Sequence, residues 1–190
     1  MTNEQRMKNL SVPTGKIDVV LDTDAYNEID DQFAISYLLL CKEKLDAKAL
    51  YAAPFLNERS TSAADGMEKS YGEILKLLSL LEENAPVFRG STSFLKDEQT
   101  PVVSPAALDL VERARQYSPE HPLYVVAIGA ITNIASALLL DPGIAENIVV
   151  VWLGGHALHN PDTQEFNMRQ DVAAARVVMG SEAPFVQLPC

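Results

Sequence analysis

The chain has few cysteines, few basic residues and no long apolar run, and each shortage excludes a class of protein. Its two cysteines, Cys41 and Cys190, provide neither a disulfide framework nor a cysteine-rich zinc site, which favours a cytoplasmic location. No apolar run approaches the roughly 20 residues that cross a bilayer. Fifteen basic residues against 26 acidic ones give a net charge of −11, so we expect neither nucleic acid nor an anionic membrane as a partner.

The composition is typical of one globular domain. At 190 residues, 47% of them hydrophobic, the chain is long enough to bury a sizeable core. Residues 1–15 begin with a polar stretch and include Pro13 and Gly15, so we expect a flexible N-terminal arm without a secretory leader. Residues 16–190 are expected to form the folded domain. Because no helical pattern follows its last predicted strand, we expect this domain to be truncated at its C-terminus.

Short apolar runs rich in β-branched residues alternate with helical patterns along the domain. We expect strands at 17–21, 47–53, 86–89, 123–128, 148–153 and 184–188. We expect helices at 30–44, 67–81, 106–116, 133–140 and 171–179. This alternation predicts an α/β fold with a doubly wound, mostly parallel, Rossmann-like sheet and helices on both faces.

The most informative segment is the acidic loop after the first predicted strand. Five acidic residues follow Leu21 within ten positions: Asp22, Asp24, Glu28, Asp30 and Asp31. Open α/β sheets bind their ligands at this carboxyl edge. Because like charges repel, a hard divalent cation is the expected neutraliser, and water on such an ion beside a spare carboxylate is a usable nucleophile. The alternative is that these carboxylates only accept loop amides and cap the next helix.

Two later strand ends bring polar groups to the same edge of the sheet. The turn Gly129–Asn133 exposes main-chain oxygens that suit a metal ion. The glycines at 154 and 155 allow close approach of a ligand, and Asn160, Glu165 and Asn167 follow them with groups that hydrogen-bond vicinal hydroxyls. Each of these features is also typical of a packed turn or a surface loop. It is their occurrence together at one edge of the sheet that indicates a ligand site.

These segments, in this order, resemble the motifs of the inosine–uridine-preferring nucleoside hydrolase family. The family's Asp-x-Asp-Pro-Gly-x-Asp-Asp is similar to Asp22–Asp31, and its Gly-x-Leu-Thr-Asn-(Ile/Val)-Ala is similar to Gly129–Ala135. Its Met-Gly-Gly and Asn…Glu-Phe-Asn are similar to Leu153–Asn167, and its Asp-Pro-Glu-Ala-Ala is similar to Asp171–Ala175. The resemblance extends from about residue 17 to the end of the chain.

The resemblance implies a salvage enzyme that hydrolyses the N-glycosidic bond of ribonucleosides with Ca²⁺ as cofactor. It implies that Asp24, Asp31 and the main-chain oxygen of Ile128 hold the ion. Asp24 is then also the base that takes a proton from the calcium-bound water, which attacks C1′ of the sugar. The reaction passes through an oxocarbenium-like state, which nearby carboxylates stabilise.

The resemblance also assigns the sugar contacts. Asp30 and Asn167 are the implied partners of the ribose 2′- and 3′-hydroxyls, and Asn160 and Glu165 are those of the 5′-hydroxyl. We therefore expect a small-molecule nucleoside or riboside as the partner, and a homodimer or homotetramer as the assembly.

Three departures from the family pattern stand out. The loop between Asp24 and Asp30 has two extra residues and lacks Pro-Gly. Residues 52–55 read Ala-Ala-Pro-Phe where the family has Ala-Gly-Asn-Val, so Asn57 is the nearest substitute for that asparagine. The family's fourth metal ligand, an aspartate preceded by histidine, lies in a C-terminal portion that has no counterpart here.

Two other interpretations remain open at this point. Haloacid-dehalogenase-like phosphotransferases also begin with Asp-x-Asp after an apolar strand, but the segments at 129–133 and 165–167 fit that family poorly. The third interpretation is a degenerate chain that keeps the fold and binds Ca²⁺ or ribosides without turnover.

Overall fold

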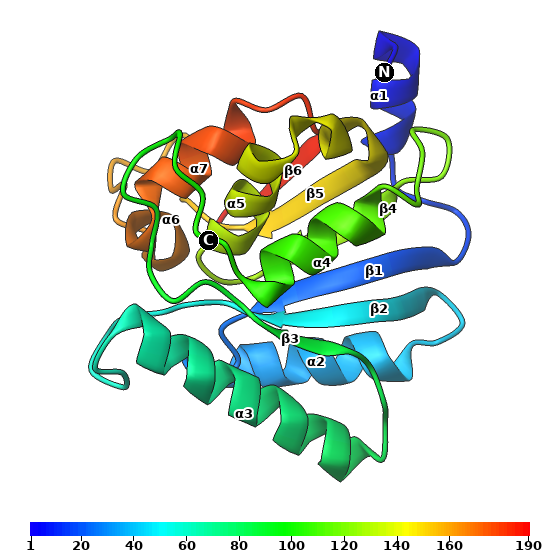
Figure 1. Ribbon diagram of the computed structural model, residues 1–190. Helices are drawn as coiled ribbons and strands as arrows, with labels where there is room; N and C mark the ends of the chain where they lie inside the picture. The colour runs from blue at the N-terminus through cyan, green and yellow to red at the C-terminus, as the bar shows by residue number, and fades with distance from the viewer.

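A computed structural model describes all 190 residues. Six strands form one sheet in the order β3-β2-β1-β4-β5-β6, and every neighbouring pair is parallel (Figure 1). The strands are β1 Ile17–Thr23, β2 Leu45–Ala52, β3 Val87–Arg89, β4 Leu123–Ala127, β5 Ile148–Leu153 and β6 Phe185–Leu188. This is the strand order of doubly wound dinucleotide-binding folds, and it confirms the predicted fold class.

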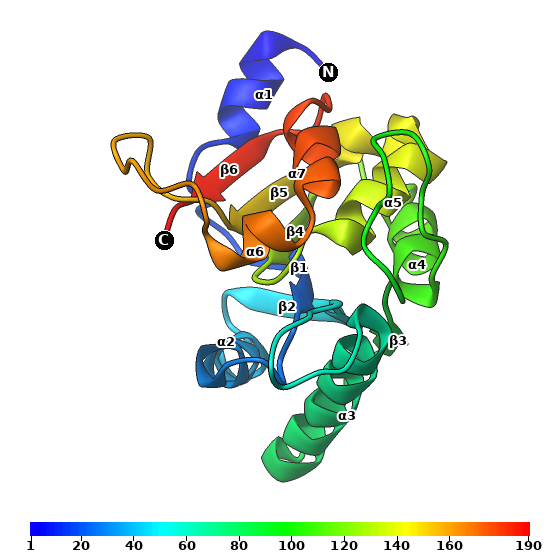
Figure 2. The same ribbon diagram turned by 90° about the vertical axis from the view of Figure 1, so that its left-hand side faces the viewer.

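Helices cover both faces of the sheet. The helices of the chain are α1 Asn3–Asn9, α2 Ile29–Leu40, α3 Ala63–Leu81, α4 Pro105–Ala114, α5 Thr132–Leu140, α6 Phe166–Gln170 and α7 Val172–Met179, with a 3₁₀ turn η1 at Pro142–Asn147. In Figure 1, α2 and α3 lie below the sheet and α4, α5 and α7 lie above it; Figure 2 gives the view along the layers. None of these helices combines the length and the apolar character needed to span a bilayer.

Two apolar layers hold the helices against the sheet. Under α2 and α3 the fully buried residues include Ile35, Leu50 and Ile74. On the opposite face the larger cluster includes Ile134 and Trp152. Apolar side chains fill both faces of the central strands, so the sheet forms the core of the molecule. A ligand can therefore reach the sheet only at the ends of its strands.

The register of the central strands determines where the loops meet. Asp22 on β1 is paired with Tyr51 on β2 and with Ala127 on β4. Parallel strands end at a common edge, so the segments that follow β1, β2, β4 and β5 emerge side by side.

Residues 3–9 form a helix that the sequence did not lead us to predict within the N-terminal arm. Thr2 caps α1 by accepting a hydrogen bond from the main-chain N–H of Gln5. The side chains of Gln5 and Asn9 both donate to the carbonyl of Pro119, at 2.9 Å each. Polar contacts rather than an apolar stripe hold this helix, so hydrophobic periodicity gave no signal for it.

Candidate functional site

Three acidic side chains are buried at the carboxyl edge of β1. Asp22, Asp24 and Asp31 expose only 0%, 1% and 5% of their surface. Burial raises the pKa of Asp22 to about 7 and that of Asp31 to about 7. Burial, and then repulsion from Asp31, raises the pKa of Asp24 well above its usual range. Burial and mutual repulsion therefore both disfavour the ionised form of these carboxyl groups.

The hydrogen-bond partners of these carboxyl groups are all neutral. Thr23 donates through its hydroxyl to Oδ1 of Asp31. Asn27 donates through Nδ2 to Oδ2 of Asp24 at 3.1 Å, and Asn133 donates through Nδ2 to Oδ1 of Asp22 at 2.7 Å. The second oxygen of Asp22 is buried and has no partner. No lysine or arginine supplies a counter-charge.

The other oxygen of Asp24 borders the end of β4. A Cβ added to Gly129 would lie 2.7 Å from Oδ1 of Asp24. The neighbouring carbonyl of Ile128 accepts a hydrogen bond from Nδ2 of Asn167 at 3.1 Å, and the same Nδ2 donates to the carbonyl of Leu153 at 3.0 Å. The ends of β1, β4 and β5 thus bring Asp24, Ile128 and Asn167 into one place, as expected for parallel neighbours.

Asp30 lies apart from the buried acids, on the rim. It is exposed, it has no hydrogen-bond partner in the chain, and it faces an open cavity of about 600 Å³. The cavity is lined by Tyr26, Glu28, Ile29, Asp30, Gln32 and Arg59. An unpaired carboxylate in this position is free to accept hydrogen bonds from a ligand.

Glu165 is occupied by main-chain amides. Its carboxylate accepts hydrogen bonds from the N–H groups of Gly155, Asn167 and Met168 at 2.7 to 2.8 Å. It therefore joins the glycine turn after β5 to the start of α6. Asn160 lies in a separate turn, where its Oδ1 accepts from the N–H of Asp162, and no hydrogen bond links it to the other candidates.

Two asparagines with direct contacts to the acidic residues were missed. Asn133, which belongs to the Gly129–Ala135 motif, holds Asp22, and its Oδ1 accepts from both the N–H and the hydroxyl of Ser91. Asn27 holds Asp24 and belongs to the lengthened signature loop. The extra residues of that loop were the one available signal for Asn27, because an insertion beside buried charges needs polar groups to satisfy them.

The substitution Gly129→Ala tests the placement of Asp24. The new Cβ would meet Oδ1 of Asp24 at 2.7 Å and the Cβ of Ala53 at 3.2 Å, so the carboxylate must move. We expect the free energy of unfolding, measured with urea, to fall by about 1–3 kcal/mol. Gly72→Ala in α3 is the matched control, because nothing lies within 4 Å of its added Cβ. Equal stability of the two variants would contradict the contact.

Known proteins and one family model match most of this chain. The family model described as inosine-uridine preferring nucleoside hydrolase matches residues 19–190. The non-specific ribonucleoside hydrolase RihC of Salmonella enteritidis PT4 is 29% identical over 195 residues, which cover 88% of this chain and 59% of the relative.

Solved structures share the fold. A plant nucleoside hydrolase, the PpNRh1 enzyme, superposes with a TM-score of 0.70 at 23% identity, covering 91% of this chain and 59% of its own. A purine-preferring ribonucleoside hydrolase from Gardnerella vaginalis gives a TM-score of 0.70 at 22% identity, covering 90% and 60%. The chain thus spans about three fifths of the length of the proteins it matches. Because the family match covers residues 19–190, which include every acidic residue described above, the chain belongs to the inosine–uridine preferring nucleoside hydrolase family.

Proposed function

We propose that this chain carries the catalytic edge of a calcium-dependent ribonucleoside hydrolase, in which water attacks C1′ and releases the base from ribose. Membership of the family and the likeness to a protein named as a non-specific ribonucleoside hydrolase support the reaction class. The observation that carries the proposal is the set of three buried carboxyl groups without a cationic partner at the carboxyl edge of the sheet.

The chemistry of these groups fits a hard cation. Buried carboxylates without a counter-charge are costly, and oxygen ligands are those that Ca²⁺ prefers. No group of three or more histidine, cysteine or acidic side chains is arranged to hold a metal by itself. The resemblance to the family's motifs implies that Asp24, Asp31 and the main-chain oxygen of Ile128 would hold the ion. When bound, the ion supplies Lewis-acid activation of water.

Asp24 is the proposed base. Its Oδ2 is held by Asn27, and its Oδ1 lies next to Gly129 at the end of β4. Because only Oδ2 receives a hydrogen bond, Oδ1 is free to accept the proton of the attacking water. The neighbouring buried carboxylates match the positive charge that develops on the sugar.

The sugar contacts follow from the groups that remain free. Asp30 has an unpaired carboxylate on the rim, and Asn167 uses its Nδ2 on two carbonyls and so keeps Oδ1 as an acceptor. We assign the 2′- and 3′-hydroxyls to these two residues. Asn160 and Glu165 are assigned to the 5′-hydroxyl, with Glu165 offering the acceptor capacity that its three amide bonds leave unused.

The reaction is tested by incubating the protein with inosine or uridine and measuring free base and ribose. We expect both products in the presence of Ca²⁺ and neither in a chelator. Calcium binding without base release would contradict hydrolysis and support a binding protein. Release of phosphate from a phosphomonoester, without base release, would instead support the dehalogenase-like alternative.

Asp30→Asn is expected to weaken substrate binding without weakening the fold. The side chain is exposed and makes no internal hydrogen bond, so the free energy of unfolding should change by less than about 0.5 kcal/mol. Loss of a charge-assisted bond to a sugar hydroxyl should raise KM about tenfold or more. Steady-state kinetics with inosine measure this, with Asp97→Asn in the loop before α4 as the control. An unchanged KM would remove Asp30 from the site.

A further inference from the structure

The loop between β2 and α3 reaches Asp24 through two asparagines. From this geometry we infer that Asn57 is a positioning residue, which fixes the direction of the hydrogen bond that Asp24 receives from Asn27. The inference rests on the proposed function, in which Asp24 is the base, and it adds a residue outside the acidic loop to the machinery.

Three hydrogen bonds run in one direction from the loop to the carboxylate. The main-chain N–H of Arg59 donates to Oδ1 of Asn57 at 2.9 Å, and Nδ2 of Asn57 donates to Oδ1 of Asn27 at 2.6 Å. Nδ2 of Asn27 then donates to Oδ2 of Asp24 at 3.1 Å. A main-chain N–H can only donate, so it sets the orientation of the first amide, which sets that of the second. The carboxylate consequently receives a donor, not a carbonyl oxygen.

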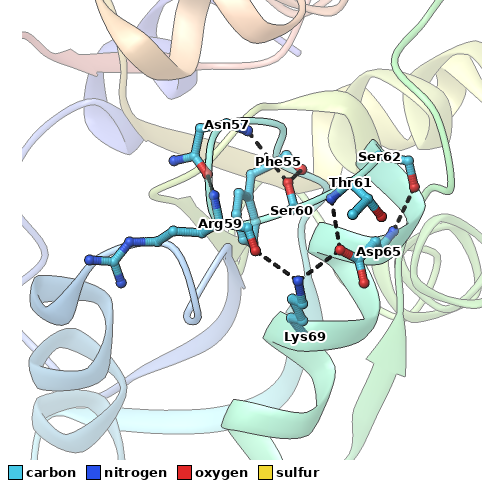
Figure 3. A network of polar contacts seen from close by, with 8 residues as sticks. All are labelled: Phe55, Asn57, Arg59, Ser60, Thr61, Ser62, Asp65 and Lys69. Carbon is cyan, nitrogen blue, oxygen red and sulfur yellow. Dashed lines mark hydrogen bonds and ion pairs between the residues drawn. The ribbon is translucent and has the colours of Figure 1, made fainter.

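We call the series of three hydrogen bonds from Arg59 through Asn57 and Asn27 to Asp24 the relay. Its start is held by several further polar contacts (Figure 3). The hydroxyl of Ser60 donates to the carbonyl of Phe55 at 3.0 Å. Lys69 on α3 donates to the carbonyl of Arg59 at 2.7 Å and to Asp65 at 2.8 Å. Figure 3 shows the Lys69 ammonium between these two acceptors, while the guanidinium of Arg59 points away from them. The backbone that orients Asn57 is therefore fixed from the helix side.

The end of the relay is closed to solvent. Asn27 is only 4% exposed, so no water easily replaces a lost partner. Its main-chain N–H also donates to the carbonyl of Asp24 at 2.7 Å, which closes a tight turn. With Oδ2 of Asp24 engaged, Oδ1 is the oxygen left facing Gly129 and the end of β4. The relay thus holds Asp24 from within a signature loop that lacks Pro-Gly.

Asn57→Asp is the sharpest test, because it replaces the donating amide by an accepting carboxylate oxygen with almost no change in volume. The new carboxylate still accepts from the N–H of Arg59, but its second oxygen faces Oδ1 of Asn27 without a proton. Asn27 must rotate its amide to donate to it, and its own oxygen then turns toward Asp24. We expect kcat to fall by about 10- to 100-fold while KM changes by less than about threefold.

Ser60→Ala is the matched control. It removes the hydroxyl that donates to the Phe55 carbonyl and accepts from the main-chain N–H of Asn57 at 3.4 Å, and it leaves the donors and acceptors of the three relay bonds unchanged. We expect kcat within about twofold of the wild-type value. Equal losses of kcat in the Ser60 and Asn57 variants would overturn the inference, because loop rigidity alone would then explain both.

A second readout does not depend on turnover. The side-chain amide protons of Asn27, assigned by their loss in Asn27→Ala, are followed in ¹H–¹⁵N correlation spectra. We expect them to shift in Asn57→Asp and to stay in place in Ser60→Ala. Unshifted Asn27 signals in Asn57→Asp would overturn the relay. If the wild-type protein releases no base, the proposed function fails, and these spectra still decide whether the relay exists.

Discussion

Replacing Asp24 by asparagine is expected to reduce base release from inosine by roughly two to four orders of magnitude, the usual worth of a general base. The amide keeps the shape of the side chain and its contact with Asn27, but it accepts no proton and carries no charge for a cation. Because Asp24 is buried beside Asp31, removing its charge also relieves repulsion. The variant should therefore be at least as stable as the wild type when both are unfolded in a chelator.

The combination of lost activity and retained stability separates a chemical role from a structural one. Asp46→Asn is the matched control, since Asp46 is partly exposed and pairs with Lys48 at the opposite edge of the sheet. This control should keep its activity within about twofold. An Asp24 variant that hydrolyses inosine as fast as the control would remove Asp24 from the mechanism.

The stability of the metal-free protein is expected to fall as the pH rises from about 5 to about 8, because burial has raised the pKa of several carboxyl groups. Asp22 and Asp31 titrate near 7 in the fold but have an ordinary value of 3.8. The folded state thus binds more protons than the unfolded state in this window, and stability is lost as they leave. For one such carboxyl the loss is roughly 4 kcal/mol when complete, before neighbouring groups adjust.

Calcium should reverse this dependence, since a cation binds the ionised carboxylates. Urea unfolding at pH 5.5 and pH 8.0, in chelator and in Ca²⁺, measures both effects. In chelator, we expect the free energy of unfolding to be larger at pH 5.5 than at pH 8.0. We expect the increase in this free energy on adding Ca²⁺ to be larger at pH 8.0. In Asp31→Asn both differences should shrink. A protein that is more stable at pH 8.0 than at pH 5.5 in chelator would contradict the assignment of raised pKa values to these carboxyl groups.

The strands and the meeting of their ends were predictable because they depend on local patterns. Runs such as 148–153 contain little except β-branched and aromatic residues, and such runs form buried strands of a parallel sheet. Once the sheet is parallel, the groups after β1, β4 and β5 must share an edge. The approach of Asp24 to Ile128 and Asn167 follows from that topology.

The remaining features depend on contacts between distant segments. Helix α1 is held by the Pro119 carbonyl, and the helix expected at 30–44 ends at Leu40 because the chain turns into β2 at Leu45. The pairing of Asn57 with Asn27 spans 30 positions and has no periodic signal. The sequence predicts which polar residues lie at the carboxyl edge of the sheet, but it does not predict which of them form hydrogen bonds with one another.

Calorimetric titration of Ca²⁺ into chelator-treated protein at pH 7.5 tests the buried carboxylate site most directly. Saturable binding of one ion per chain, weakened at least about tenfold in Asp31→Asn, is the predicted result. Absence of saturable heat in the wild type, or equal affinity in the two proteins, would contradict a cation held by Asp24, Asp31 and the carbonyl of Ile128.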